Sequence, residues 1–327
     1  MSRCLENGKT AFVDILDEDE VAFGSTEFVV MSPTKEVLPK FVYYTARRSE
    51  IVRKAFKWRN GTTARRQRIS TEVFDYIEIK VPPVTTQKRI VKVLDQLDSK
   101  IEQLEAESQR LEEAGKEIFK NYYEDIPKSQ YTTYAFSDVA DFVDGMAFSQ
   151  EDWSNEGEPI IKIDELNSGV TRRTDQYNEE VLEKYKLSPG DVLFAWSASL
   201  GIYYWDRDYG ILNQHIFNVI PKRELNRPLL YFFLKRSMPE FLSLAHGTTT
   251  KHINRSALDE VEIKLPNSEL LDELDILIRP IFEKMVQNGL EISKLEELRD
   301  ALLPKLMSGE IRVDDIKLDE LEVDCEV

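Results

Sequence analysis

Two long stretches of the chain carry apolar or small residues at alternating steps of four and three. This heptad spacing keeps one stripe of a helix against a partner helix. The positions between them are densely charged, which is typical of an exposed coiled coil and not of helices buried in a larger core. The pattern predicts two long helices, over residues 85–126 and 267–308, that pack antiparallel as a coiled-coil spacer, with a kink at Pro280. The apolar seam residues are Ile90, Leu94, Leu97, Ile101, Leu104, Leu111 and Ile118 in the first helix, and Leu274, Ile278, Ile281, Met285, Ile292, Leu295 and Leu302 in the second.

Each predicted helix closes one copy of an internal repeat. A Gly-Thr-Thr triplet occurs twice, 186 residues apart, and a strand-like segment ending in proline occurs twice, 184 residues apart, with four of its six positions identical. Upstream of both lie apolar helix starts preceded by a proline. Order and spacing agree, so we interpret the chain as a duplicated unit. The matching segments are residues 61–63 and 247–249, 77–82 and 261–266, and 41–44 and 231–234.

The region between the helices, residues 127–266, has the pattern of a mixed domain with many short strands. The sequence therefore predicts an α+β fold in which a mixed α/β domain plus a long helix occurs twice, with a shorter first domain over 1–84 and an acidic tail over 309–327. Apolar, β-favouring runs predict the strands, and an amphipathic run predicts a helix interrupted at Pro239. The runs are residues 136–143, 160–163, 191–196, 202–205 and 216–220 for strands, and 229–244 for the helix.

Charge is distributed unevenly in this chain of 327 residues and formal net charge −17. Residues 40–70 hold ten basic side chains against one acid, Glu50, which leaves a local charge of +9 in an otherwise acidic protein. A solvated surface strip is the ordinary explanation of such a run. A nucleic-acid contact is the alternative, because affinity for phosphate is mostly electrostatic.

Motifs that build catalytic sites are missing from the sequence. The 13 glycines are at least nine residues apart, which excludes a dinucleotide turn or a phosphate loop. The three histidines lack zinc-protease spacing, and Cys4 and Cys325 stand at opposite ends, so we expect no metal site and no disulfide framework. Without a signal peptide or a membrane-length apolar run, a cytoplasmic location is expected.

Taken together, several motifs resemble the DNA-specificity subunits of type I restriction–modification systems. The resemblance covers nearly the whole chain to about residue 312. It is carried by Gly61-Thr62-Thr63 with Arg65, Arg66, Gln67 and Arg68; the run ending in Pro82-Pro83; Gln87, Ile90, Leu94 and Leu97; residues 187–193; Asn213-Gln214-His215; and residues 302–311.

This resemblance implies a non-catalytic subunit that reads bipartite double-stranded DNA. Two target-recognition domains at the ends of the coiled-coil spacer would each read one half-site. Methylation would belong to methyltransferase subunits that bind S-adenosylmethionine, and cleavage to a restriction and translocase subunit that uses ATP and Mg²⁺; no cofactor is expected in this chain. The alternatives are a coiled-coil scaffold, or a degenerate or split subunit that binds the methyltransferase and reads only one half-site.

The two copies of the repeat differ in length. The second has 116 residues between Tyr131 and His246, ahead of its Gly-Thr-Thr, whereas the first has 60. If residues 8–12 correspond to 201–205, the first copy lacks the counterpart of residues 134–192. We expect a rearranged or 5′-truncated reading frame, half of a split subunit completed by a second chain, or a homodimer that uses the second domain only.

The DNA-contacting candidates are basic, amide or hydroxyl side chains near the repeated triplets and at strand ends. Trp196 also fits core packing, His215 fits a structural role better than base reading, and the threonines also fit a purely loop-shaping role. The candidates are Lys57, Arg59, Thr62, Thr63, Arg65, Arg66 and Arg68 in the first domain, and Lys162, Trp196, Ser197, Thr248, Thr249, Lys251, His252, Asn254 and Arg255 in the second.

Overall fold

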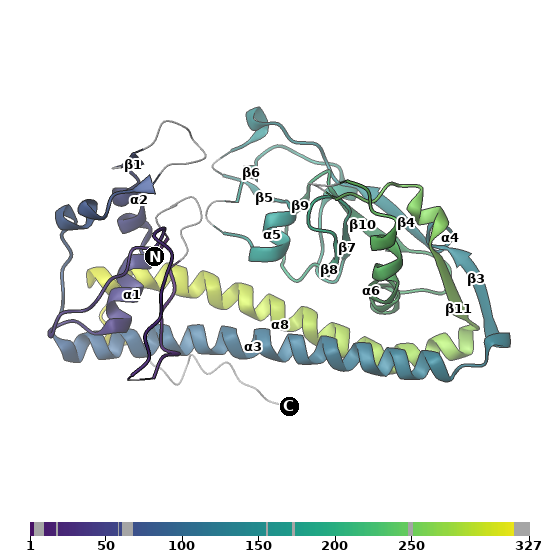
Figure 1. The fold of residues 1–327 in the computed structure, drawn as a ribbon, viewed down its shortest axis with the longest axis horizontal. Helices are drawn as coiled ribbons and strands as arrows, with labels where there is room; N and C mark the ends of the chain where they lie inside the picture. Colours follow the sequence, from purple (N-terminus) through teal and green to yellow (C-terminus); the bar gives the residue numbers. More distant parts are fainter. Residues whose placement is uncertain are drawn as a thin grey trace. The chain divides into compact units, whose positions relative to one another are not determined.

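The chain forms two compact units in a computed structural model, and each is described by itself (Figure 1). Unit 1 comprises residues 1–101 and 295–327, and unit 2 comprises residues 102–294. The structure describes residues 1–2, 10–17, 19–57, 59–60, 68–154, 156–171, 174–247 and 251–316.

Two long helices contribute to both units. Helix α3 spans Val84–Asp125 and helix α8 spans Ser268–Ser308. At 1.5 Å per residue, each is roughly 60 Å long. Helix α8 continues through Pro280 without a break. The side chain of this proline is exposed.

The helices pair along the predicted seams. In unit 1, Leu94 of α3 packs in one cluster with Leu303 and Leu306 of α8. In unit 2, the Asn288 amide lies 3.2 Å from the Ser108 hydroxyl, and Tyr122 donates to Glu273. Residue numbers rise along one helix as they fall along the other, so the pairing is antiparallel in each unit. All fourteen seam residues are buried or half-buried, the half-buried ones being Leu111, Ile118, Ile281 and Leu302.

Unit 2 contains three small sheets. The largest is antiparallel, with the strand order β4-β10-β7-β8. A three-stranded sheet has the order β6-β5-β9, with β5 and β9 parallel, and β11 pairs antiparallel with β3. The strands are β3 (Tyr131–Ala135), β4 (Ala140–Asp144), β5 (Glu158–Ile161), β6 (Gln176–Tyr177), β7 (Val192–Ala195), β8 (Gly201–Tyr204), β9 (Ile211–Leu212), β10 (Ile216–Pro221) and β11 (Glu262–Pro266).

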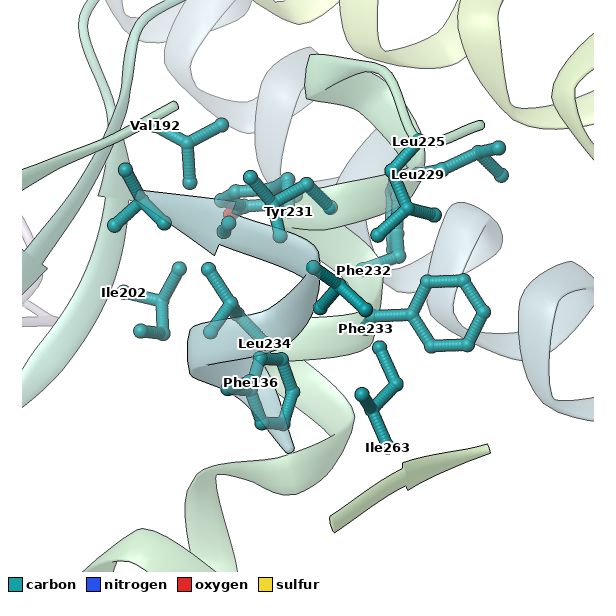
Figure 2. Packing of buried hydrophobic residues seen from close by; sticks show 14 of the residues in the cluster. Phe136, Val192, Ile202, Leu225, Leu229, Tyr231, Phe232, Phe233, Leu234 and Ile263 are labelled. Carbon is teal, nitrogen blue, oxygen red and sulfur yellow. The ribbon is translucent and has the colours of Figure 1, made fainter. Parts of the chain in front are cut away.

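Helix α6 (Arg227–Ser243) packs against β7, β8 and β10 and forms the centre of the core of unit 2. Figure 2 shows its residues Tyr231–Leu234 beside Val192 and Ile202 of the sheet and Phe136. The predicted interruption at Pro239 is wrong: α6 continues through this proline, at the loss of one backbone hydrogen bond. Residues 228–234 are buried on all sides, which is not the amphipathic pattern expected, and together with the buried Ser237 and Phe241 they stabilise a helix whose Pro239 is itself exposed.

The segment 136–143 was predicted as one strand, and half of that prediction is wrong. Residues Phe136–Val139 form one helical turn, α4, and only then does β4 begin. The Asp138 carboxylate accepts from the Ala135 backbone N–H at 3.2 Å, which caps the turn. The same turn buries both Phe136 and Val139 completely. The remaining short elements of unit 2 are α5 (Ile163–Ser168), α7 (Ala257–Glu260) and the 3-10 turns η3 (Lys128–Gln130), η4 (Gln150–Asp152) and η5 (Glu183–Tyr185).

Unit 1 has less regular structure. Helix α1 starts at its predicted proline, and its Phe41 and Tyr44 pack on α3. Gln87, fully buried, holds the start of α3: its side chain accepts from the Leu38 N–H at 2.9 Å and donates to the Glu36 and Pro82 carbonyls. The elements of unit 1 besides the long helices are α1 (Pro39–Arg47), α2 (Ser49–Lys57), β1 (Arg59–Asn60), β2 (Arg68–Ile69), η2 (Thr71–Tyr76) and η6 (Val313–Asp315).

Within the described ranges, no helix is long and apolar enough to cross a membrane. The mixed composition of helices and sheets, with two long paired helices, confirms the predicted α+β class.

Candidate nucleic-acid interface

Two predicted groups of DNA-contacting residues in unit 2 lie side by side, although more than 50 residues separate them in sequence. The chain leaving β7 at Trp196 pairs with the chain that follows the second Gly-Thr-Thr. The Ile253 N–H donates to the Trp196 carbonyl at 2.8 Å, and the Ala198 N–H donates to the Lys251 carbonyl at 2.9 Å. Between them, Ser197 and His252 form a β-bridge. The end of a core strand therefore fixes the loop that carries the basic residues.

A second pairing closes that loop at its base. His246 and His252 exchange backbone hydrogen bonds, both of 2.9 Å, and their rings lie 6.4 Å apart. Gly247 then adopts φ +108°, a backbone conformation that favours glycine. Thr248 and Thr249 lie outside the described residues.

Arg255 has a defined position with its charge accessible. Its guanidinium lies 5.6 Å from the centre of the Phe217 ring and donates to the Phe142 carbonyl at 3.0 Å. It also forms an ion pair with Asp144 at 2.8 Å, while 64% of the side chain stays exposed. An exposed, positioned guanidinium of this kind can exchange its carboxylate for a DNA phosphate or a guanine edge.

Trp196 is part of both the core and the surface. Its ring lies 5.8 Å from Phe217 and 5.4 Å from His215, and the residue is half-buried. The indole N–H has no hydrogen-bond partner among the described residues. We call Trp196, Ser197, His215, His246, Lys251, His252 and Arg255 the loop cluster.

His215 was expected to be a structural histidine rather than a base reader; the residue is exposed, and its role stays a prediction. Its carbonyl accepts from the Trp196 N–H at 3.4 Å, and this bond places the imidazole beside the indole. His246 was not predicted at all. Its signal in the sequence was its position directly before the second triplet.

At the end of β7 away from the cluster, Asp191 fixes the start of the strand. Its carboxylate accepts from the Ser188 N–H at 2.8 Å and the Asn218 amide at 3.4 Å, and it forms an ion pair with Arg227. Burial raises the pKa of Asp191, although the bonds from Ser188 and Arg227 oppose the shift. These contacts explain the Ser-Pro-Gly-Asp motif as the turn that connects β7, β10 and α6.

The other candidates of unit 2 lie next to the cluster or elsewhere. Asn254 is exposed and lies between Ile253 and Arg255. Lys162 follows β5 on the three-stranded sheet, where it forms an ion pair with Asp175 and lies 4.4 Å from the centre of the Trp153 ring. We therefore place Lys162 outside the loop cluster.

In unit 1, the candidates surround a segment that the structure does not describe. Lys57 is exposed at the end of α2. The backbones of Arg59 and Arg68 belong to the short β1–β2 pair, where Arg59 is opposite Ile69. Thr62, Thr63, Arg65 and Arg66, together with the side chains of Arg59 and Arg68, lie outside the described residues.

Part of the basic strip has a structural role in unit 1. Lys40 pairs with Asp95 at 2.8 Å, and Arg47 pairs with Asp98 at 3.0 Å, which fastens α1 to α3. Arg48 pairs with Glu50 at 2.9 Å. The charge of +9 therefore overstates what this strip can present to a ligand.

Across the described part of the chain, no three His, Cys, Asp or Glu side chains gather as metal ligands.

Comparison with known proteins agrees with the motifs. The type I restriction modification DNA specificity domain matches residues 4–113 and 128–294. The type I restriction enzyme HindI specificity subunit of Haemophilus influenzae is 24% identical, over 93% of this chain and 84% of that one. The MjaIX specificity subunit of Methanocaldococcus jannaschii is 25% identical, over 87% of this chain and 72% of that one. A crystal structure of a type I restriction-modification S subunit from M. genitalium aligns with a TM-score of 0.48 and 17% identity, over 83% of this chain and 73% of that one.

Because the family match covers well over half of its residues, the chain belongs to the type I restriction modification DNA specificity family.

Proposed function

We propose that the chain is the sequence-reading, non-catalytic component of a type I restriction–modification complex. The loop cluster of unit 2 contacts one half of a bipartite double-stranded target, the basic segment of unit 1 contacts the other half, and the paired helices α3 and α8 act as the spacer. The pairing of the end of β7 with the loop after the second Gly-Thr-Thr carries the proposal, because it brings Trp196, Lys251 and Arg255 to one surface.

The chemistry of the loop cluster suits DNA. Lys251 and Arg255 supply charge for phosphates, and an arginine can also form a bidentate contact with guanine. The imidazoles of the cluster add hydrogen-bonding groups and flat surfaces beside those charges, and the half-buried indole of Trp196 packs beside the Phe217 ring that Arg255 also contacts. Little further chemistry is needed in this chain if methylation and cleavage take place elsewhere in the complex.

Because methylation and cleavage would take place in other subunits, we propose the following partners. Methyltransferase subunits would bind S-adenosylmethionine and flip the target base out of the duplex, and a restriction and translocase subunit would use ATP and Mg²⁺. A net charge of −17 disfavours DNA binding by this chain alone, so partner subunits would add positive surface.

The test is a charge-matched comparison in the complex with the methyltransferase subunit. Lys251→Ala/Arg255→Ala changes the loop cluster, whereas Lys128→Ala/Lys184→Ala removes two exposed charges from elsewhere in unit 2. The first variant should weaken DNA binding about 100-fold and reduce the salt dependence by about two counterions. The control should bind nearly as the wild type does. Equal affinities for the two variants would contradict the assignment.

A second candidate is a subunit that reads a single half-site through unit 2. It is favoured by the poor burial of apolar side chains in unit 1, in which Ile15, Val21, Phe23 and Val30 are each more than 75% exposed. The methylated sequence distinguishes the two candidates, because one reading domain cannot define two different half-sites.

A further inference from the structure

Residues 77–81 of unit 1 form a segment whose backbone edge is unpaired within the described part of the chain. They follow η2 and lead into Pro82, and they belong to no helix or strand. The backbone groups of Ile79 and Val81 have no hydrogen-bond partner among the described residues. Their side chains are also accessible, with Ile79 38% and Val81 42% exposed.

The matching segment of unit 2 is a paired strand. There the equivalent residues form β11, which lies antiparallel to β3, with Ile263 opposite Tyr134 and Leu265 opposite Thr132. Ile263 is 2% and Leu265 is 5% exposed. Nearly the same sequence is thus buried against a partner strand in unit 2, whereas in unit 1 it is partly exposed and no described residue pairs with it.

The register of β11 shows which backbone groups need a partner. The Phe136 N–H donates to the Val261 carbonyl at 3.3 Å, so Val261 belongs to a hydrogen-bonded pair. Such pairs alternate along an antiparallel ladder, which makes Ile263 and Leu265 the next residues that bond to β3. In the first copy of the repeat these residues correspond to Ile79 and Val81.

We propose that residues 77–81 accept an antiparallel β-strand from a second polypeptide, one with the sequence pattern of residues 131–139. That pattern is a Tyr/Thr-rich strand followed by a helical turn that begins with phenylalanine. This concerns the assembly of unit 1 and does not depend on DNA recognition.

Three observations favour this occupant. The acceptor sequence is repeated with four of six positions identical, so it suits the same kind of strand that β11 binds. The described residues of unit 1 contain no strand equivalent to β3. An exposed apolar edge is also a liability that proteins normally cover, and adding a strand satisfies its backbone and its side chains together.

The test uses the full chain and a fluorescent peptide of residues 128–141. Saturable binding is expected by fluorescence anisotropy. Ile79→Pro removes an N–H that faces the added strand and should weaken binding at least about tenfold, the equivalent of one hydrogen bond. Lys80→Pro imposes the same backbone restriction at a residue whose N–H faces away, and should bind nearly as the wild type does.

A second pair of measurements modifies the backbone of the peptide and leaves the chain unchanged. Methylating the backbone nitrogen of Tyr134 should abolish binding, whereas methylating that of Thr133 should be tolerated, because only the former faces the acceptor. Absence of saturable binding, or equal effects of the two prolines or of the two methylations, would overturn the proposal. No DNA is present, so the outcome is independent of the proposed function.

Discussion

Glu112 joins three positive or polar groups inside unit 2. Its carboxylate accepts from the Tyr231 hydroxyl at 2.9 Å and pairs with Lys116 and Lys235, both at 2.9 Å. Burial alone would raise its pKa, but the two lysines and the tyrosine lower the pKa of Glu112 to about 2. Burial also lowers the pKa of Lys235, which Glu112 opposes. The ionised carboxylate thus keeps the half-buried Lys235 charged between α3 and α6.

Glu112→Gln should therefore destabilise unit 2 by roughly 3 kcal/mol at neutral pH, because Lys235 would lose its partner. The carboxyl pKa is lower in the folded than in the unfolded state, so its stabilisation is complete above about pH 4.5 and is lost as the pH falls toward 2. Denaturant unfolding of both proteins between pH 7 and pH 2 measures this. A difference in unfolding free energy that stays constant to pH 2 would contradict the role of Glu112.

Asp144 competes for the guanidinium that we assign to DNA. It lies 2.8 Å from Arg255 on the surface of unit 2. Asp144→Asn should tighten DNA binding by the methyltransferase complex about threefold at low salt, because it removes a competing charge. Asp141→Asn is the matched control, since Asp141 belongs to the same strand and pairs with Lys222 instead. The gain should vanish when Arg255 is also alanine, and titrations that show equal gains for both asparagine variants would argue against this competition.

At the scale of elements, a glycine in the seam sets the distance between α3 and α6. A Cβ atom at Gly115 would lie 2.5 Å from the Cζ atom of the buried Phe232 ring and 3.3 Å from Ile281. The helix interior would otherwise favour alanine by about 1 kcal/mol. The close approach explains why the heptad pattern contains a glycine here.

Gly115→Ala should consequently lower the free energy of unfolding by about 1–3 kcal/mol despite its better helix propensity. Asn121→Ala, at an exposed position of the same helix, should leave stability nearly unchanged or raise it slightly. Denaturant unfolding followed by circular dichroism compares the two. A Gly115→Ala variant as stable as the wild type would mean that Phe232 moves aside at little cost.

Elements with a strong period were predictable, and elements defined by their partners were not. The seams of α3 and α8 and the apolar strands β7, β8 and β10 follow directly from hydrophobic spacing. Strand β3 was missed, because its residues are mostly half-buried or exposed and only its bonds to β11 define it. The prediction that Pro239 interrupts α6 was wrong because the packing of α6 in the core outweighs the local cost of a proline.

The loop cluster could be predicted only in part. Composition and the repeat indicated Trp196, Ser197, Lys251, His252 and Arg255 as separate candidates. Their convergence depends on hydrogen bonds between distant segments, and this has no signal in a single sequence. A nucleic-acid contact was one of the two interpretations of the basic run over residues 40–70. Lys40, Arg47 and Arg48 instead pair with acidic side chains of unit 1, which the sequence alone did not indicate.

At the scale of the whole molecule, the two units share a repeat but differ in how far its apolar residues are buried. In unit 2 the repeated segment 261–266 contains the paired strand β11 over a large core, whereas in unit 1 its counterpart 77–82 belongs to no strand and is partly exposed. The central claim is that this chain sets the DNA sequence recognised by its complex, with one half-site for each unit.

Methylome mapping tests that claim most directly. The chain would be expressed with its methyltransferase subunit in a host that lacks DNA methylation, and modified adenines would be located by long-read sequencing. We expect two different half-sites separated by a fixed gap, and loss of the unit 2 half-site from the motif in Lys251→Ala/Arg255→Ala. A symmetric motif would contradict reading by unit 1, and an assembled complex that methylates no defined sequence would contradict DNA recognition by this chain altogether.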